Sequence, residues 1–335
     1  MGDLGSEPPT TEKSASIFLQ IVEHPDGTVT RPFVPLIPVT DGDGPLIPVT
    51  DGNRDAVAVR SRDVLLGPFK ISLRIYLPEL HSSPSEKLPL VLFFHGGGFV
   101  LFRPASAPYH FSCEHMARSL SAIVLSLDYR LAPEHRLPAA YDDAVESILW
   151  VRSQAAADPS ERDPWLAEHA DFGRFFIMGS SSGANMAFHS ALRVSDLDLQ
   201  PLQIAGIVLN QPYLGGEERT PSEEASEEDA ILPLRANDML WRLALPLGAD
   251  RDHEYCNPVS AMAVEKISKM PARCLVKGRR GDPLIDRQRQ LLHVMEAAGL
   301  RVVGQLEDEG FHAIELLVPS AAEALFTDVS EFFNA

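Results

Sequence analysis

Residues 174–192 read RFFIMGSSSGANMAFHSAL, the pattern of a strand, a tight turn and a helix. Residues 175–178 are apolar and aromatic, as in a buried strand, and apolar side chains recur at helical spacing after residue 183. Between them lies Gly179-Ser180-Ser181-Ser182-Gly183, whose small side chains let a strand turn sharply into a helix. Such a turn holds the residue at its tip in the open, so the pattern predicts Ser181 as an exposed nucleophile.

Apolar runs of strand length alternate with helical patterns along the chain from residue 71 onward. This alternation is typical of an α/β protein with a mostly parallel sheet, and right-handed crossovers make it one doubly wound sheet with helices on both faces. The predicted strands are ISLRIYL (71–77), LPLVLFF (88–94), AIVLSLD (122–128), RFFIMG (174–179), IAGIVLN (204–210), ARCLVKG (272–278) and RVVGQLE (301–307). The predicted helices span about 107–120, 139–156, 182–195, 284–298 and 320–333.

The bulk properties of the 335-residue chain are those of an ordinary globular protein, with 45% hydrophobic and 23% charged residues. Its net charge of -18 disfavours nucleic acid and acidic membranes as partners, because both need a basic surface. The N-terminus lacks the pattern of a secretory signal and no apolar run is long enough to span a membrane, which predicts a cytoplasmic protein. Three scattered cysteines fit neither a disulfide framework nor a metal site, so we expect buried free thiols. We also expect a monomer or a weak homodimer.

Two segments outside the alternating pattern are predicted to form a cap on a single domain, residues 1–335; the alternative is that both simply extend the core. The first, up to about residue 35, contains an apolar element around residues 17–22. The second, residues 212–256, is too long for a simple crossover and has an amphipathic pattern with Met239, Leu240, Trp241 and Leu243. Its acidic run, which starts at Glu223, is predicted to be a solvated face. Between residues 35 and 52, PLIPVTDGDG is followed at once by PLIPVTDGNR, which predicts an enlarged surface loop.

His95-Gly96-Gly97-Gly98 ends the predicted strand 88–94. When a serine attacks a carbonyl, the oxygen becomes an oxyanion, and glycines let main-chain N–H groups approach it closely. We expect Gly96 and Gly97 to donate two hydrogen bonds of this oxyanion hole, and the N–H of Ser182, at the start of a helix, to donate a third. His95 is expected to brace the loop.

The base and the acid of a triad are expected downstream of Ser181, in the order serine, acid, histidine. His312 follows the predicted strand 301–307, whereas His293 falls within a helical run, so His312 is predicted to be the base. Asp282 follows the predicted strand 272–278 and is predicted to be the acid. Asp286 and Asp308 are more simply explained as a surface charge and a turn residue.

Further motifs give the chain a family resemblance. They are HGGGF (95–99), DYRLAPEHRLPAAYDD (128–143), GSSSG (179–183), GADRDHEYCNP (248–258), GDPLIDR (281–287) and GFHA (310–313). With them the chain resembles the plant carboxylesterases of the hormone-sensitive-lipase-like group, which have the α/β-hydrolase fold. The resemblance implies hydrolysis of small carboxylic esters without a cofactor, and a triad of Ser181, Asp282 and His312. We expect the cap and the loop after HGGG to build the pocket, with Phe99, Phe102 and Trp241 as wall residues, although aromatic residues at these positions could equally belong to the core.

The turn departs from the pattern of that group, which more often has an acid where this chain has Ser180 and an alanine where it has Ser182.

Two other functions occur on the same fold. A hormone receptor resembling the gibberellin receptors would lack the histidine, and His312 argues against it. A carbon–oxygen lyase or cyclase of specialised metabolism would use the same pocket, and Ser181 favours acyl chemistry instead.

Overall fold

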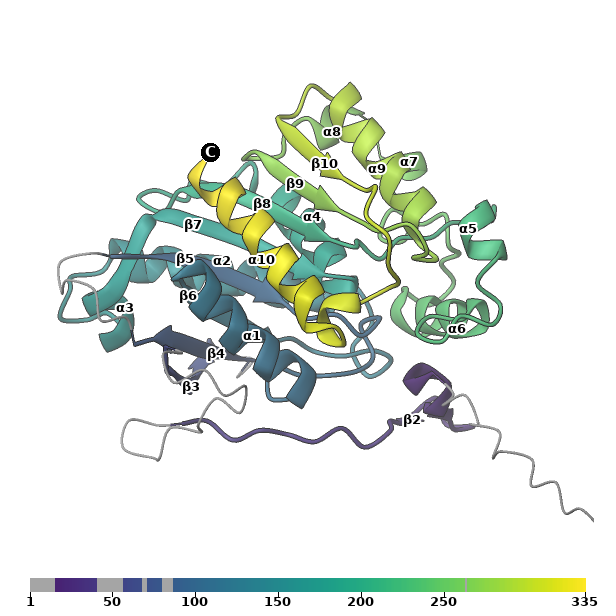
Figure 1. The fold of residues 1–335 in the computed structure, drawn as a ribbon, viewed down its shortest axis with the longest axis horizontal. Coiled ribbons are helices and arrows are strands. Elements are labelled where there is room, and N and C mark those ends of the chain that lie inside the picture. The colour runs from purple at the N-terminus through teal and green to yellow at the C-terminus, as the bar shows by residue number, and fades with distance from the viewer. Residues whose placement is uncertain (1–15, 41–56, 68–70, 80–86, 263) are drawn as a thin grey trace, which may run out of the picture.

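The structure is a computed structural model that describes residues 16–40, 57–67, 71–79, 87–262 and 264–335. An eight-stranded sheet runs through its centre in the strand order β10-β9-β8-β7-β5-β6-β4-β3 (Figure 1). The strands β10, β9, β8, β7, β5 and β6 are all parallel to one another. At the edge beyond β6, β4 pairs antiparallel with β6, and β3 pairs antiparallel with β4. The predicted sheet is thereby confirmed. Its strands are β3 (Val59–Leu66), β4 (Ile71–Pro78), β5 (Leu88–Phe94), β6 (Ile123–Asp128), β7 (Ala170–Ser180), β8 (Ile204–Asn210), β9 (Cys274–Lys277) and β10 (Val302–Gln305).

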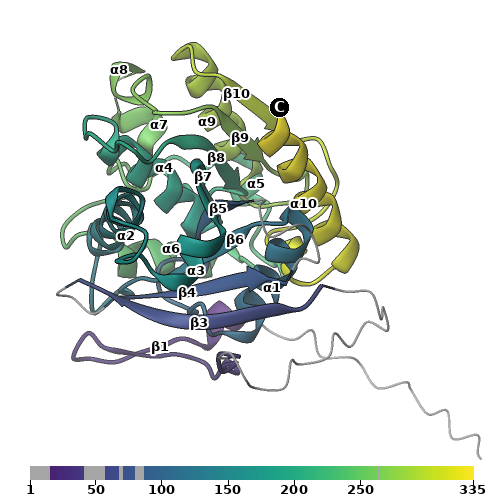
Figure 2. The ribbon, with the colours of Figure 1, turned by 90° about the vertical axis from the view of Figure 1, so that its left-hand side faces the viewer.

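Helices cover both faces of the sheet (Figure 2). Helices α1 (Ala107–Leu120) and α10 (Pro319–Asn334) pack on one face through one apolar cluster. Helices α2 (Ala139–Ala156), α4 (Ser182–Val194) and α9 (Ile285–Ala297) contribute to a second cluster on the other face. Because both faces are covered, β5 is buried over its whole length, which explains its unbroken apolar sequence LPLVLFF.

Strand β3 was not predicted from the sequence. It reads VRSRDVLL and pairs only with β4, at the edge of the sheet. Its side chains alternate between buried and more exposed positions, and Arg60 and Arg62 are among the more exposed ones. An edge strand of this kind lacks the apolar run by which the central strands were predicted.

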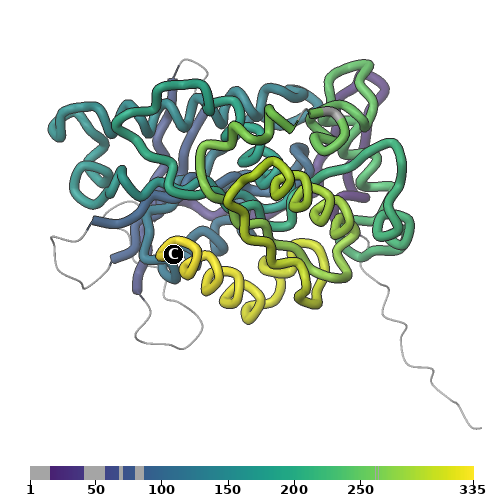
Figure 3. Tube along the Cα trace, turned by 90° about the horizontal axis from the view of Figure 1, so that it is seen from above, coloured from purple at the N-terminus to yellow at the C-terminus, as the bar shows by residue number. Residues whose placement is uncertain are grey.

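The N-terminal segment, residues 16–35, lies beside residues 212–256, which we call the insertion (Figures 1 and 3). The Ser16 hydroxyl donates to the Ile231 carbonyl at 2.6 Å, and Arg242 forms an ion pair with Glu23, also at 2.6 Å. The segment has one 3₁₀ turn, η1 (Ile17–Gln20), and a short hairpin of β1 (Val22–Glu23) and β2 (Val29–Thr30). The insertion contains α5 (Pro221–Glu224) and α6 (Leu234–Ala244).

Glu223 corrects the prediction that the whole acidic run is solvated. Its side chain is fully buried and forms an ion pair with Arg287 on α9 at 3.0 Å. Its carboxylate also accepts a hydrogen bond from the N–H of Thr220, closing a capping box at the start of α5. The buried pair attaches the insertion to the helix that follows Asp282.

Short elements complete the described parts of the chain: α3 (Pro164–His169), α7 (Pro258–Ala261), α8 (Val264–Ile267) and η2 (Ile314–Leu316). None of the helices in the described ranges is long and apolar enough to cross a bilayer. All three cysteines are buried free thiols, as predicted.

Residues 41–52 of the duplicated loop lie outside the described residues. Residues 35–37 run along the start of α1, where the Ala107 N–H donates to the Pro35 carbonyl at 2.8 Å.

Candidate active site

Ser181 occupies the turn between β7 and α4, with φ 56° and ψ −121°. This conformation is strained for a residue with a side chain, and the close packing of the turn imposes it. A Cβ on Gly183 would lie 1.8 Å from the Phe94 carbonyl oxygen, so only glycine fits there. The main-chain N–H of Ser181 donates to the carbonyl of Asn210 at 2.9 Å, which ties the turn to the end of β8.

The structure brings Ser181, His312 and Asp282 together. His312 Nε2 lies 2.8 Å from Ser181 Oγ, and His312 Nδ1 lies 3.1 Å from each carboxylate oxygen of Asp282. Ser181 follows β7, Asp282 follows β9 and His312 follows β10, so all three lie at the carboxyl edge of the parallel strands. This is the arrangement of nucleophile, base and orienting acid.

The electrostatics of His312 fit a base in this position. Burial alone would lower its pKa, but the charge and hydrogen bond of Asp282 more than offset this and raise the pKa above the usual value for histidine. The imidazolium that forms after proton transfer is therefore stabilised where it is needed.

Asp282 is held by three further hydrogen bonds. Its Oδ2 accepts from Gln211 Nε2 at 2.8 Å and from Gln288 Nε2 at 2.9 Å, and its Oδ1 accepts from the N–H of Leu284 at 2.9 Å. Gln211 also holds the residues on both sides of His312: it donates to the carbonyl of Phe311 at 3.0 Å and accepts from the N–H of Ala313 at 2.9 Å. Neither glutamine was predicted. For Gln211, its position directly after the predicted strand 204–210 was the available signal.

The predicted oxyanion-hole residues surround Ser181. A Cβ on Gly96 would lie 3.0 Å from the Cβ of Ser181, so the glycine lets the loop pack directly on the nucleophile. Gly97 lines the cavity onto which Ser181 opens, and Ser182 is the first residue of α4, where main-chain N–H groups are free of helix partners. His95 is fully buried behind this loop.

His95 braces the loop from behind. Its ring stacks on Tyr129 with a centroid distance of 4.2 Å, and the Tyr129 hydroxyl donates to the His95 carbonyl at 2.9 Å. Burial lowers the pKa of His95 to about 4, so the ring is neutral at physiological pH. Arg130, the next residue, forms an ion pair with buried Asp143 at 2.7 Å. DYRLAPEH is thus a supporting motif in this structure.

Ser181 and His312 open onto a cavity of about 850 Å³. Its described walls come from the N-terminal segment, the loop after HGGG, α1, the insertion and the region around η2. His312 is the only one of these lining side chains that can carry a charge near neutral pH. The described lining residues are Ser16, Ile17, Phe18, Gln20, Phe33, Val34, Pro35, Gly97, Phe102, Ala107, Pro108, Tyr109, Phe111, Ser181, Ala230, Ile231, His312, Ala313, Leu316 and Leu317.

Of the three predicted wall residues, only Phe102 lines this cavity. Phe99 and Trp241 are each 1% exposed and contact one another, with ring centroids 5.9 Å apart. Trp241 also stacks on Tyr213 at 4.5 Å. These rings belong to the core under the loop after HGGG, which corrects the prediction. Tyr109 and Phe111, which line the cavity from α1, were not predicted.

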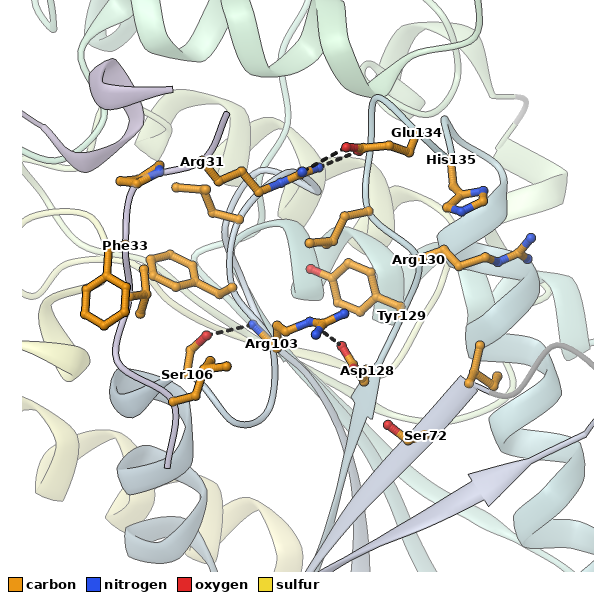
Figure 4. A pocket seen from close by; sticks show the side chains of 17 residues that line it. Arg31, Phe33, Ser72, Arg103, Ser106, Asp128, Tyr129, Arg130, Glu134 and His135 are labelled. Carbon is orange, nitrogen blue, oxygen red and sulfur yellow. Dashed lines mark hydrogen bonds and ion pairs between the residues drawn. The ribbon is translucent and has the colours of Figure 1, made fainter. Parts of the chain in front are cut away.

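A second cavity, of about 810 Å³, lies between the N-terminal segment and the loop after β6 (Figure 4). Phe33 and Phe102 are among the residues that line both cavities. Figure 4 shows two ion pairs at its wall, Arg31 with Glu134 and Arg103 with Asp128. Their closest nitrogen–oxygen distances are 2.5 Å and 3.5 Å. None of the cavity's described lining residues belongs to the triad.

The rejected alternatives for the triad lie elsewhere. His293 is exposed on α9. Asp286 accepts from the N–H of Ser222 at 3.0 Å and pairs with Arg289 at 3.1 Å. Asp308 pairs with Arg279 at 3.7 Å.

Comparison with known proteins gives the family. The family described as alpha/beta hydrolase fold matches residues 91–316. Probable carboxylesterase 8 of Arabidopsis thaliana is 41% identical over 98% of this chain and 96% of its own length. A 3-O-acetylpapaveroxine carboxylesterase of Papaver somniferum is 45% identical over 78% of this chain and 86% of its own. Among solved structures, a hyperthermophilic esterase of the archaeon Pyrobaculum calidifontis is similar with a TM-score of 0.68 and 26% identity, over 82% of this chain and 85% of its own. The chain belongs to the α/β-hydrolase family and, within it, to the group that contains these plant carboxylesterases.

Proposed function

We propose that the protein is a serine carboxylesterase that hydrolyses uncharged esters through an acyl-enzyme on Ser181. The observation that carries this proposal is the 2.8 Å contact between Ser181 Oγ and His312 Nε2, at the wall of an apolar cavity. The names of the carboxylesterase relatives support the same reaction class.

In the first half of the reaction, His312 Nε2 takes the proton of the Ser181 hydroxyl as its oxygen attacks the ester carbonyl. Asp282 holds Nδ1 and stabilises the imidazolium. The main-chain N–H groups of Gly96, Gly97 and Ser182 donate to the oxyanion. When the tetrahedral intermediate collapses, His312 returns the proton to the departing alcohol, and the acyl group stays on Ser181.

In the second half, a water molecule takes the place of the alcohol. His312 removes its proton, the hydroxide attacks the acyl carbonyl, and the carboxylic acid leaves as Ser181 recovers its proton. The balance is one ester and one water for one acid and one alcohol. No cofactor takes part in these steps.

The walls of the cavity support an uncharged substrate. The charge on an anionic ester would lose its hydration in this cavity, where His312, which must be neutral to act as the base, is the only described lining residue that could become a cation. Because the N-terminal segment and the insertion both supply walls and contact one another, we propose that they form the cap that selects the substrate.

A fluorophosphonate probe tests the proposal directly, because it reacts only with an activated serine. Peptide mapping by mass spectrometry should find one adduct, on Ser181, and the loss of ester hydrolysis should follow the extent of labelling. A folded protein that hydrolyses no ester and takes up no probe would contradict the proposal. Product analysis separates hydrolysis from elimination: an alcohol and an acid are expected, with no unsaturated or cyclised product.

A further inference from the structure

Glu315 is a buried carboxyl group beside the triad for which the mechanism above has no role. It lies on η2, three residues after His312, and is 9% exposed. Its Oε1 accepts a hydrogen bond from Asn210 Nδ2 at 2.8 Å. An acidic side chain is buried in this way only where its surroundings compensate for the lost hydration.

Asn210 connects Glu315 to the nucleophile. The same Nδ2 donates to Ser180 Oγ at 3.0 Å, and the Asn210 main-chain carbonyl accepts the N–H of Ser181 at 2.9 Å. One asparagine therefore joins the turn that carries the nucleophile to the segment that follows the base.

The charged and titratable groups around Glu315 come from several elements. His312 precedes it, Tyr109 faces it from α1, and Arg279 faces it from the loop after β9. Burial raises the pKa of Glu315, while the interactions with His312, Ser180 and Arg279 oppose this rise. His312 in turn is acted on by the carboxylates of Asp282, Glu315 and Asp229, each of which favours its protonated form. Glu315 is thus a second carboxylate that acts on the base.

We propose that the Asn210 amide holds the Glu315 carboxylate beside His312, where it stabilises the imidazolium formed when Ser181 loses its proton. Glu315 is a positioning residue, since it acts through His312 and is not among the described residues that line the cavity. This role rests on the proposed esterase function. The uncharged Ser180 hydroxyl is the second acceptor of the Asn210 amide, beside the Glu315 carboxylate.

The variant Glu315→Gln tests the proposal because it keeps an acceptor oxygen of the same shape and removes the charge. The matched control is Glu309→Gln, which removes a charge from an exposed residue three positions before His312. The readout is the acid limb of kcat/KM for an uncharged short aryl ester, which reports the pKa of the base. We expect Glu315→Gln to move this limb to lower pH by about half a unit or more and to lower the plateau roughly three- to tenfold. Glu309→Gln should leave both unchanged.

If the acid limb of kcat/KM lies at the same pH in Glu315→Gln and Glu309→Gln, the proposal is overturned, because a carboxyl with a purely structural role does not act on the pKa of the base. The double variant Ser180→Asp/Glu315→Gln returns one carboxylate to the same Asn210 amide and decides the matter if the single variant does not fold. We expect the acid limb of this double variant to lie at the same pH as that of the parent, whereas an acid limb at lower pH would contradict the proposal. Hydrolysis by the parent protein tests the esterase function separately. If the parent hydrolyses the ester but Glu315→Gln does not shift the acid limb, only the proposed role of Glu315 is refuted.

Discussion

Gln211 Nε2 lies 2.8 Å from Asp282 Oδ2, and the same side-chain amide holds the main chain on both sides of His312. One glutamine thus fixes the acid and the base relative to one another. We expect Gln211→Ala to lower kcat for ester hydrolysis roughly 10- to 100-fold with little change in KM, because the catalytic groups lose alignment while the cavity stays intact. Gln290→Ala, an exposed position on α9, serves as the control. A parent-like kcat in Gln211→Ala would show that the triad holds itself in place.

Ser181→Ala should abolish the hydrolysis of a short aryl ester, with a loss on the order of 10⁴- to 10⁶-fold, because the triad acts as a unit. The fold should persist, which circular dichroism and thermal unfolding check. Substantial residual activity in a purified, folded variant would move the nucleophile to another residue.

Asp282→Asn should lower kcat by roughly 10⁴-fold, because an amide in this position favours the wrong tautomer of His312. Asp286→Asn is the matched control: its carboxylate binds Ser222 and Arg289 instead, so we expect a loss of less than about tenfold. Steady-state kinetics of the two variants decide between them, and the reverse ranking would assign the acid to Asp286.

The pH dependence of kcat/KM follows from the raised pKa of His312. Only the neutral imidazole can accept the Ser181 proton, so activity is present above the pKa of His312 and is lost as the pH falls through it. Because Asp282 raises this pKa, the acid limb should lie above the ordinary histidine value of about 6.5. A pH–rate profile with an uncharged ester measures it. A limb well below that value would mean that Asp282 does not stabilise the imidazolium.

Deletion of residues 1–30 should change ester selectivity. It removes Ser16, Ile17, Phe18 and Gln20 from the described cavity wall, so esters with bulky acyl groups should gain in kcat/KM relative to acetates. Ser181 should still react with the fluorophosphonate probe. Deletion of residues 1–15 removes none of the described wall residues and is the control. If both truncated proteins fold and keep the parent selectivity, the segment has no part in choosing the substrate.

The sequence allowed the sheet and the positions of Ser181, Asp282 and His312 to be predicted, because each lies directly after a recognisable strand or in a glycine-flanked turn. Glu315 could not be found in this way, since its proposed role depends on a hydrogen bond from Asn210, 105 positions away. Phe99 and Trp241 were misplaced because an aromatic residue near a site has the same sequence pattern whether it faces a pocket or the core.

The buried pair of Glu223 and Arg287 determines which wall of the active-site cavity can move. Lifting the insertion away from α9 would separate two charges that are at most 8% exposed, a costly step. The pair of Glu23 and Arg242 lies at the surface, with 36% and 60% of the two side chains exposed, and contributes little to stability. If one wall of the cavity moves to release product, we therefore expect it to be the N-terminal segment. Since salt screens the surface pair far more than the buried one, we expect higher ionic strength to loosen the N-terminal segment and to leave the insertion attached to the helix that follows the catalytic acid.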